Sequence, residues 1–154
     1  MQELGGLWVD AIVTVLGKPE AVHAWTCKTE READGFADNQ VALFEYPDLV
    51  ATLRCNHVDP FGFPRREFAV VEDSGYAQIR PTDPAELVLA LSCPQGEFEA
   101  GVQTVPLEGP AVRFDKEVTD FARAICGEKA LRWNAEHDLV VEESLLLACG
   151  LPVD

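Results

Sequence analysis

The apolar and polar positions of the chain follow a helical pattern near both ends and a strand pattern between them. The first apolar run covers residues 7–16 and is followed by Gly17 and Pro19. A glycine and then a proline directly after an apolar run are typical of the end of a helix. The pattern therefore predicts a short buried helix at the start of the chain.

The middle of the chain consists of short runs rich in β-branched and aromatic residues. Turn sequences separate them, including Pro47-Asp48, Asp73-Ser74-Gly75 and Pro94-Gln95-Gly96, and the polar segment 28–38 predicts a longer hairpin loop. Connections this short cannot carry a parallel crossover, so we expect antiparallel pairing. The expected strands are 21–27, 40–46, 49–57, 67–72, 76–80, 86–93 and 98–105.

Two helical patterns follow the strands. In the first, apolar residues recur at i, i+3, i+4 and i+7, with Asp115 as the expected N-cap and Gly127 as the end. In the second, Asn134 is the expected N-cap, and residues 139–149 are apolar on nearly all sides, which predicts burial. The apolar face of the first helix consists of Val118, Phe121, Ala122 and Ile125.

One helix, about seven strands and two further helices, in this order, predict an α+β fold. We expect an open, mainly antiparallel β-sheet with helices packed on one face. The 154 residues form one domain of ordinary size. The other face of the sheet would then be free for a partner domain, a ligand or a second copy of the chain.

The charge and the cysteines narrow the possible partners and compartment. A formal net charge of −15 repels phosphate groups, so we expect neither nucleic acid nor membrane as a partner. The five cysteines are widely spread and form no CxxC pair, which argues against a disulfide framework or a zinc site. The N-terminus lacks the basic segment of a signal peptide. These features predict a cytoplasmic protein.

Motifs for cofactors and metals are missing from the sequence. No GxGxxG or GxxxxGK[ST] segment links a strand to a helix, so we expect no cofactor-binding residues in this chain. No two of His23, His57 and His137 lie at metal-ligand spacing, and we expect no metal site. Structural roles, such as helix capping near His137, are the simpler expectation for these histidines.

Three stretches resemble the glucose–fructose oxidoreductase/inositol dehydrogenase (Gfo/Idh/MocA) family. Residues 3–10, continuing to Leu16-Gly17, are similar to its Asp-x-Gly-x-His-x-x-Asp helix that ends in Leu-Gly. Residues 67–79 are similar to its strand, glycine turn and strand. Residues 114–125 and 136–150 look like its C-terminal signature. The resemblance covers nearly the whole chain in the right order.

The resemblance implies the C-terminal domain of a two-domain enzyme. In such an enzyme a Rossmann domain binds NAD or NADP and supplies a catalytic lysine, and the C-terminal domain shapes a sugar or polyol site and often mediates oligomerisation. Hydride leaves a carbinol carbon while a base takes the hydroxyl proton. The Rossmann domain is absent from residues 1–154, so we expect no catalysis by this chain alone. The implied partners are a Rossmann domain of a longer parent, or a second copy through the sheet face.

The candidate site residues come from matching this sequence to the family motifs. Leu7 stands at the position of the family histidine and can neither donate nor accept a proton, so no catalytic residue is expected. Glu3 stands at the aspartate position, and Asp10 matches. With Glu3, the strand end at Asn56 and His57 forms the candidate substrate-binding set. The simpler alternatives are a solvated terminal acid for Glu3 and a polar loop edge for Asn56 and His57.

Two functional hypotheses stay open. The first is a C-terminal substrate-binding and oligomerisation domain of an NAD(P)-dependent oxidoreductase that acts on sugars or polyols. The second is a stand-alone, non-catalytic dimerisation or small-ligand-binding module derived from that family, which Leu7 favours. Arg65 and Arg66 could contact an anionic ligand, but pairing with surface carboxylates is the simpler expectation in so acidic a chain.

Overall fold

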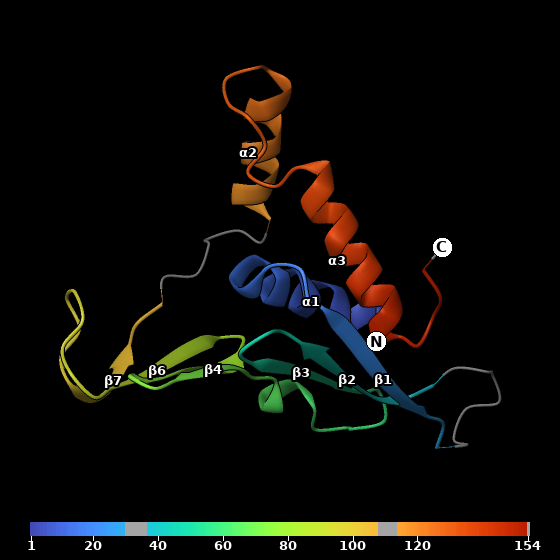
Figure 1. The fold of residues 1–154 in the computed structure, drawn as a ribbon. Coiled ribbons are helices and arrows are strands. Elements are labelled where there is room, and N and C mark those ends of the chain that lie inside the picture. Colours follow the sequence, from blue (N-terminus) through green and yellow to red (C-terminus); the bar gives the residue numbers. More distant parts are fainter. Residues whose placement is uncertain (30–36, 108–113, 154) are drawn as a thin grey trace. The chain divides into compact units, whose positions relative to one another are not determined.

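The computed structural model describes residues 1–29, 37–107 and 114–153 (Figure 1). The expected order of elements and the α+β class are confirmed, and the expected loop at 28–38 lies mostly outside the described residues. In chain order the elements are α1 (Gln2–Leu16), β1 (Ala21–Cys27), β2 (Asn39–Glu45), β3 (Val50–Asn56), the 3₁₀ helix η1 (Phe63–Arg65), β4 (Phe68–Glu72), β5 (Gly75–Thr82), β6 (Ala85–Leu91), β7 (Gly101–Val105), α2 (Asp115–Ile125) and α3 (Ala135–Ala148).

The strands are antiparallel, as expected, and they divide between two hydrogen-bonded sheets. One sheet has the order β1-β2-β3 and the other β4-β5-β6-β7. The chain likewise divides into two compact units. Unit 1 comprises Met1–Val58 with Ala130–Asp154, and unit 2 comprises Asp59–Lys129. Unit 1 therefore contains the three-stranded sheet, and unit 2 contains the four-stranded sheet.

Unit 1 holds the buried core. Helices α1 and α3 pack against each other and on the three-stranded sheet, α1 over β3 and α3 over β1 and β2 (Figure 1). In β2 every second residue is buried, which is the alternation of a strand with one covered face. The helices thus cover one face of this sheet, as predicted. The buried apolar residues are Met1, Val9, Ile12, Val13, Ala42, Phe44, Tyr46, Leu53, Cys55, Leu145 and Ala148.

Unit 2 has no comparable core, because none of its described residues is fully buried. Its sheet is a simple meander, and Asp73 and Ser74 form the two-residue turn between the paired residues Glu72 and Gly75. The predicted turn at 73–75 is therefore confirmed. The connection from β6 to β7 is longer than predicted. Residues 92–100 form it, with Gln95 and Phe98 paired across it.

The helix ends test the capping expectations. Asn134 caps α3, since its side-chain oxygen accepts a hydrogen bond from the His137 backbone N–H at 2.9 Å. The expectation that Asp115 caps α2 was wrong. Phe114 occupies the N-cap position with φ of 68°, and Asp115 is the first helical residue. Its carboxylate lies in the first turn, where its negative charge interacts favourably with the positive end of the helix dipole. Gly127, with φ of 74°, follows the end of α2 as expected.

No helix among the described residues is long and apolar enough to cross a membrane. All five cysteines are free thiols.

Candidate functional site

A cluster of buried polar groups lies where β2 begins and β3 ends, beside the first turn of α1. Asp38 and Gln40 are only 2% and 5% exposed. Gln40 is paired with Cys55 in the register of β2 and β3. The backbone N–H of His57 donates to the Asp38 carbonyl oxygen at 2.8 Å. The segment entering β2 and the segment leaving β3 are thus joined at this corner.

The Asp38 carboxylate is held by Thr29. The Thr29 hydroxyl donates to Oδ2 at 2.6 Å, and the Thr29 backbone N–H lies 3.2 Å from both carboxylate oxygens. The hydroxyl bond is the main reason why the pKa of Asp38 lies below its ordinary value, while burial acts in the opposite direction. The Thr29 hydrogen bonds therefore stabilise the ionised form of the Asp38 carboxyl, which is the form present at neutral pH.

His57 and Gln40 converge on the first turn of α1. The Nε2 atom of His57 lies 3.5 Å from the Met1 backbone nitrogen, and Gln40 Oε1 accepts a hydrogen bond from the same nitrogen. Cys55 lies beside them, and burial raises the pKa of its thiol. An imidazole and an amide at such a corner can both donate and accept hydrogen bonds. This chemistry suits the hydroxyl groups of a small polar ligand.

The predicted site residues differ in whether they contact the corner at the start of α1. Glu3 lies in α1, with its side chain outside the described part, and Leu7 is 80% exposed on the same helix. His57 reaches the start of α1. Asn56 has a local contact, because its Oδ1 accepts from the Val58 backbone N–H at 3.0 Å. The role of these residues in substrate binding stays a prediction.

A second polar contact joins two of the motifs that carry the family resemblance. His137 Nε2 on α3 lies 2.7 Å from Asp10 Oδ1 on α1, and the His137 ring stacks on Trp133 with 4.5 Å between ring centroids. From the sequence we expected helix capping to explain His137, and the observed cap uses only its backbone N–H. The pairing of its ring was missed because Asp10 is 127 residues away. That both residues lie in family-like motifs was the available signal.

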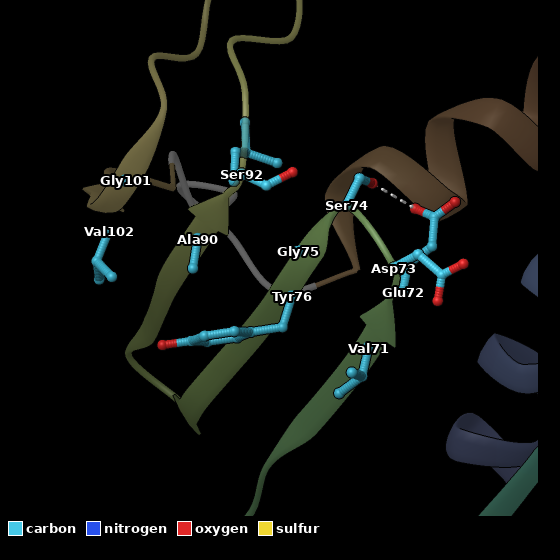
Figure 2. A pocket seen from close by; sticks show the side chains of 11 residues that line it. Val71, Glu72, Asp73, Ser74, Gly75, Tyr76, Ala90, Ser92, Gly101 and Val102 are labelled. Carbon is cyan, nitrogen blue, oxygen red and sulfur yellow. Dashed lines mark hydrogen bonds between the residues drawn. The ribbon is translucent and has the colours of Figure 1, made fainter.

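Unit 2 contributes a shallow pocket of about 370 Å³ at the β4–β5 turn (Figure 2). Its floor is a row of apolar side chains on one side of the sheet, set by the register of neighbouring strands. Glu72, Asp73 and Ser74 lie at its rim, and the Ser74 hydroxyl donates to Glu72 at 3.3 Å. The floor residues are Val71, Tyr76, Ala90 and Val102.

The described residues do not fit a dinucleotide. All strand pairs are antiparallel hairpin neighbours, whereas a dinucleotide site needs a parallel βαβ unit with a glycine-rich turn at the helix start. The described residues also contain no group of three or more His, Cys, Asp or Glu side chains placed to hold a metal ion.

No protein-family model matches the sequence, and no curated protein matches it. Solved structures do. The structure of a protein from Thermotoga maritima that is described as an oxidoreductase matches with TM-score 0.71 and 20% identity, over 95% of this chain and 43% of that chain. A protein assigned as an NADPH-dependent oxidoreductase from Desulfitobacterium hafniense matches with TM-score 0.71 and 17% identity, over 96% and 44%. A UDP-N-acetylglucosamine 3-dehydrogenase from Acidithiobacillus ferrooxidans matches with TM-score 0.67 and 16% identity, over 95% and 45%.

This chain therefore spans less than half the length of these solved oxidoreductases. At these low identities, the TM-scores establish that the fold is shared. The fold that the resemblance implies is confirmed: nearly the whole chain has the fold of one part of these longer oxidoreductases.

Proposed function

We propose that this chain is the C-terminal, substrate-side domain of an NAD(P)-dependent oxidoreductase that acts on sugars or polyols, and that it is inactive without a Rossmann domain. The main support is the fold match over 95% of this chain but only 43–45% of two longer oxidoreductases. The free thiols support a reducing compartment such as the cytoplasm.

In this proposal the corner between α1 and β3 faces the substrate. His57 would hydrogen-bond a substrate hydroxyl and orient the carbinol carbon, while buried Gln40 holds the start of α1 at this corner through its bond from the Met1 nitrogen. Glu3 and Asn56 would contribute from the start of α1 and the end of β3. Leu7 is apolar, so the base that takes the hydroxyl proton would come from the Rossmann domain. NAD(P), when bound there, supplies the hydride acceptor.

The sheet of unit 2 supports a role in association. Val71 and Val102, which end a cross-strand row that also contains Tyr76 and Ala90, are 82% and 72% exposed. Exposed apolar rows of this kind are typical of a surface that a partner covers. We propose that a second copy of the chain covers this face, as in an isologous dimer.

The alternative is a stand-alone module that keeps the fold without redox chemistry. One observation favours it: Leu7 occupies the position where the family carries a histidine, and it is 80% exposed. This alternative retains ligand binding or dimerisation but has no Rossmann partner.

A binding experiment tests the proposed site. Ligand-observed NMR with a panel of polyols, hexoses and nucleotide sugars should show binding to the chain. Removing the imidazole in His57→Ala should weaken that binding about tenfold or more, because a buried hydrogen bond to the ligand is lost. His23→Ala is the matched control, since His23 is an exposed residue of β1 that pairs with Glu45. Equal loss in both variants, or saturable binding of NADH to the chain, would contradict the proposed site.

A further inference from the structure

The three-stranded sheet of unit 1 has a second face that its helices leave open. In β2, the residues Gln40, Ala42 and Phe44 are buried on the side of α1 and α3. Because side chains alternate along a strand, Val41 and Leu43 point to the opposite side. We call that side, which carries Val41 and Leu43 of β2, the open face of unit 1.

The strand register shows which other side chains share this face. Directly paired residues of antiparallel strands place their side chains on the same face. Trp25 pairs with Val41, and Val41 pairs with Arg54, so these three residues form one row across the open face. A neighbouring contact agrees with this arrangement, because His23 Nε2 lies 3.1 Å from Glu45 Oε2 on the same face.

The row brings an aromatic ring and a cation within reach of one small ligand. The Cα atoms of Trp25 and Arg54 lie two strand spacings apart, roughly 10 Å. Val41 separates them and is short, whereas both flanking side chains are long enough to lean over it. A ligand that rests on Val41 can therefore touch the indole ring and the guanidinium at the same time.

The charge of Arg54 has no partner within the described residues. Its side chain is exposed, and it contacts neither a carboxylate nor an aromatic ring, although the chain has a formal net charge of −15. Every other arginine in the described part of the chain has such a contact. The contacts are Arg65 with Asp59, Arg80 with Glu67, Arg123 with Glu128, Arg66 with Phe63 and Arg132 with Trp133. The Arg54 guanidinium is thus available to bind an anion.

The groups around the row suit a sugar ring. Trp25 is 61% exposed, so its indole offers a flat apolar surface on which a ring can stack. Thr52 pairs with Leu43, and Asn39 pairs with Cys27, which places a hydroxyl and an amide beside the row. Both groups can donate hydrogen bonds to ligand hydroxyls and accept them. A stacking ring, hydroxyl partners and one cation together match a sugar that carries a phosphate.

We propose that the open face of unit 1 binds a phosphorylated sugar, with the sugar ring stacked on Trp25 above Val41 and the phosphate at Arg54. The net charge of the chain repels anions in general, so this binding depends on the one unpaired arginine and weakens as salt screens it. The site is separate from the corner at His57, because Gln40 of that corner lies on the other face of β2. The inference therefore goes beyond the proposed function and does not rest on it.

The test is an NMR titration of the ¹⁵N-labelled chain with glucose 6-phosphate. The chain has three tryptophans, and Trp25→Phe identifies the indole N–H resonance of Trp25. That resonance should shift saturably at millimolar ligand. Arg54→Gln should weaken the binding about fivefold or more, because the charged contact to the phosphate is lost. Glucose, which lacks the phosphate, should bind the wild type more weakly by a similar factor.

Controls separate this site from general anion binding. Arg123→Gln removes the same charge from an exposed arginine of unit 2 and should leave the affinity unchanged within about twofold. Inorganic phosphate, which cannot stack, should bind about fivefold more weakly than glucose 6-phosphate. Equal affinity for the two would overturn the stacking on Trp25, and equal affinity of Arg54→Gln and wild type would overturn the role of Arg54. No saturable shift of the Trp25 resonance up to about 20 mM glucose 6-phosphate would overturn the site as a whole.

Discussion

Among the glycines that the structure describes, Gly75 at the start of β5 is the position where an added methyl group should have the largest effect. A Cβ atom there would lie 1.9 Å from the Ala90 carbonyl oxygen, 3.0 Å from the Ala90 carbonyl carbon and 3.2 Å from Leu91 Cα. These atoms belong to the backbone of the neighbouring strand β6, so no side chain can rotate away. The two strands must separate locally if Gly75 becomes alanine.

The size of that separation gives the expected magnitude. A close carbon–oxygen contact needs about 3.3 Å, so the strands must move apart by roughly 1.4 Å at this point. The adjacent ladder bonds would then exceed hydrogen-bonding distance, including the 2.8 Å bond from the Ser92 N–H to the Ser74 carbonyl. Loss of one or two hydrogen bonds together with the steric strain corresponds to about 2–4 kcal/mol for Gly75→Ala.

Hydrogen exchange measured by mass spectrometry can check this free energy directly in the affected strands, β5 and β6. Amides of β5 and β6 should exchange about 30- to 1000-fold faster in Gly75→Ala, because local opening becomes easier by that free energy. Gly6→Ala is the control with the same chemical change. Gly6 lies within α1, and its Cβ would meet Leu145 Cδ2 of α3 at an ordinary 3.7 Å. Alanine should therefore stabilise unit 1 by about 0.5–1 kcal/mol. Unchanged exchange in β5 and β6 of Gly75→Ala would refute the reasoning.

Two further predictions concern the polar contacts of unit 1. The pKa of Asp38 lies below its ordinary value of 3.8, so its charge stabilises the folded chain above that pH, and the contribution is lost as the pH falls through the lowered pKa. The difference in unfolding free energy between the wild type and Asp38→Asn should therefore shrink below pH 3.8 in urea titrations, and a difference that stays constant from pH 7 to pH 2 would argue against it. For the contact between Asp10 and His137, a double-mutant cycle with Asp10→Asn and His137→Ala should give a coupling of about 0.5–1 kcal/mol, because the Asp10 side chain is 44% exposed and partly screened. Strictly additive single effects would show that the pair contributes nothing.

Local sequence signals predicted the elements well. The strand 21–27 is observed with the same limits, and the Asn134 cap is confirmed by its hydrogen bond. Such features depend on residues a few positions apart. The Asp115 cap failed because an N-cap aspartate and a first-turn aspartate differ by one residue and both suit a helix start.

Contacts between distant residues could not be predicted in the same way. The pattern of apolar residues located seven strands but carried no information on how hydrogen bonding divides them between two sheets. The Thr29–Asp38 bonds and the contact of His137 with Asp10 depend on packing of α1, α3 and the strand ends. His57 was proposed as a site residue through the family resemblance, and this role stays a prediction. The contact of Gln40 with the start of α1 was not predicted, because no local signal distinguishes this glutamine from the other residues of its strand.

The most direct test of the central claim is to read the gene upstream of the Met1 codon. The account predicts an in-frame segment that encodes a Rossmann domain, with a GxGxxG turn between a strand and a helix and a lysine to serve the chemistry. A stop codon directly upstream, preceded by no such domain in frame, would contradict the claim that this chain is the substrate-side domain of an oxidoreductase, and would leave the stand-alone binding module.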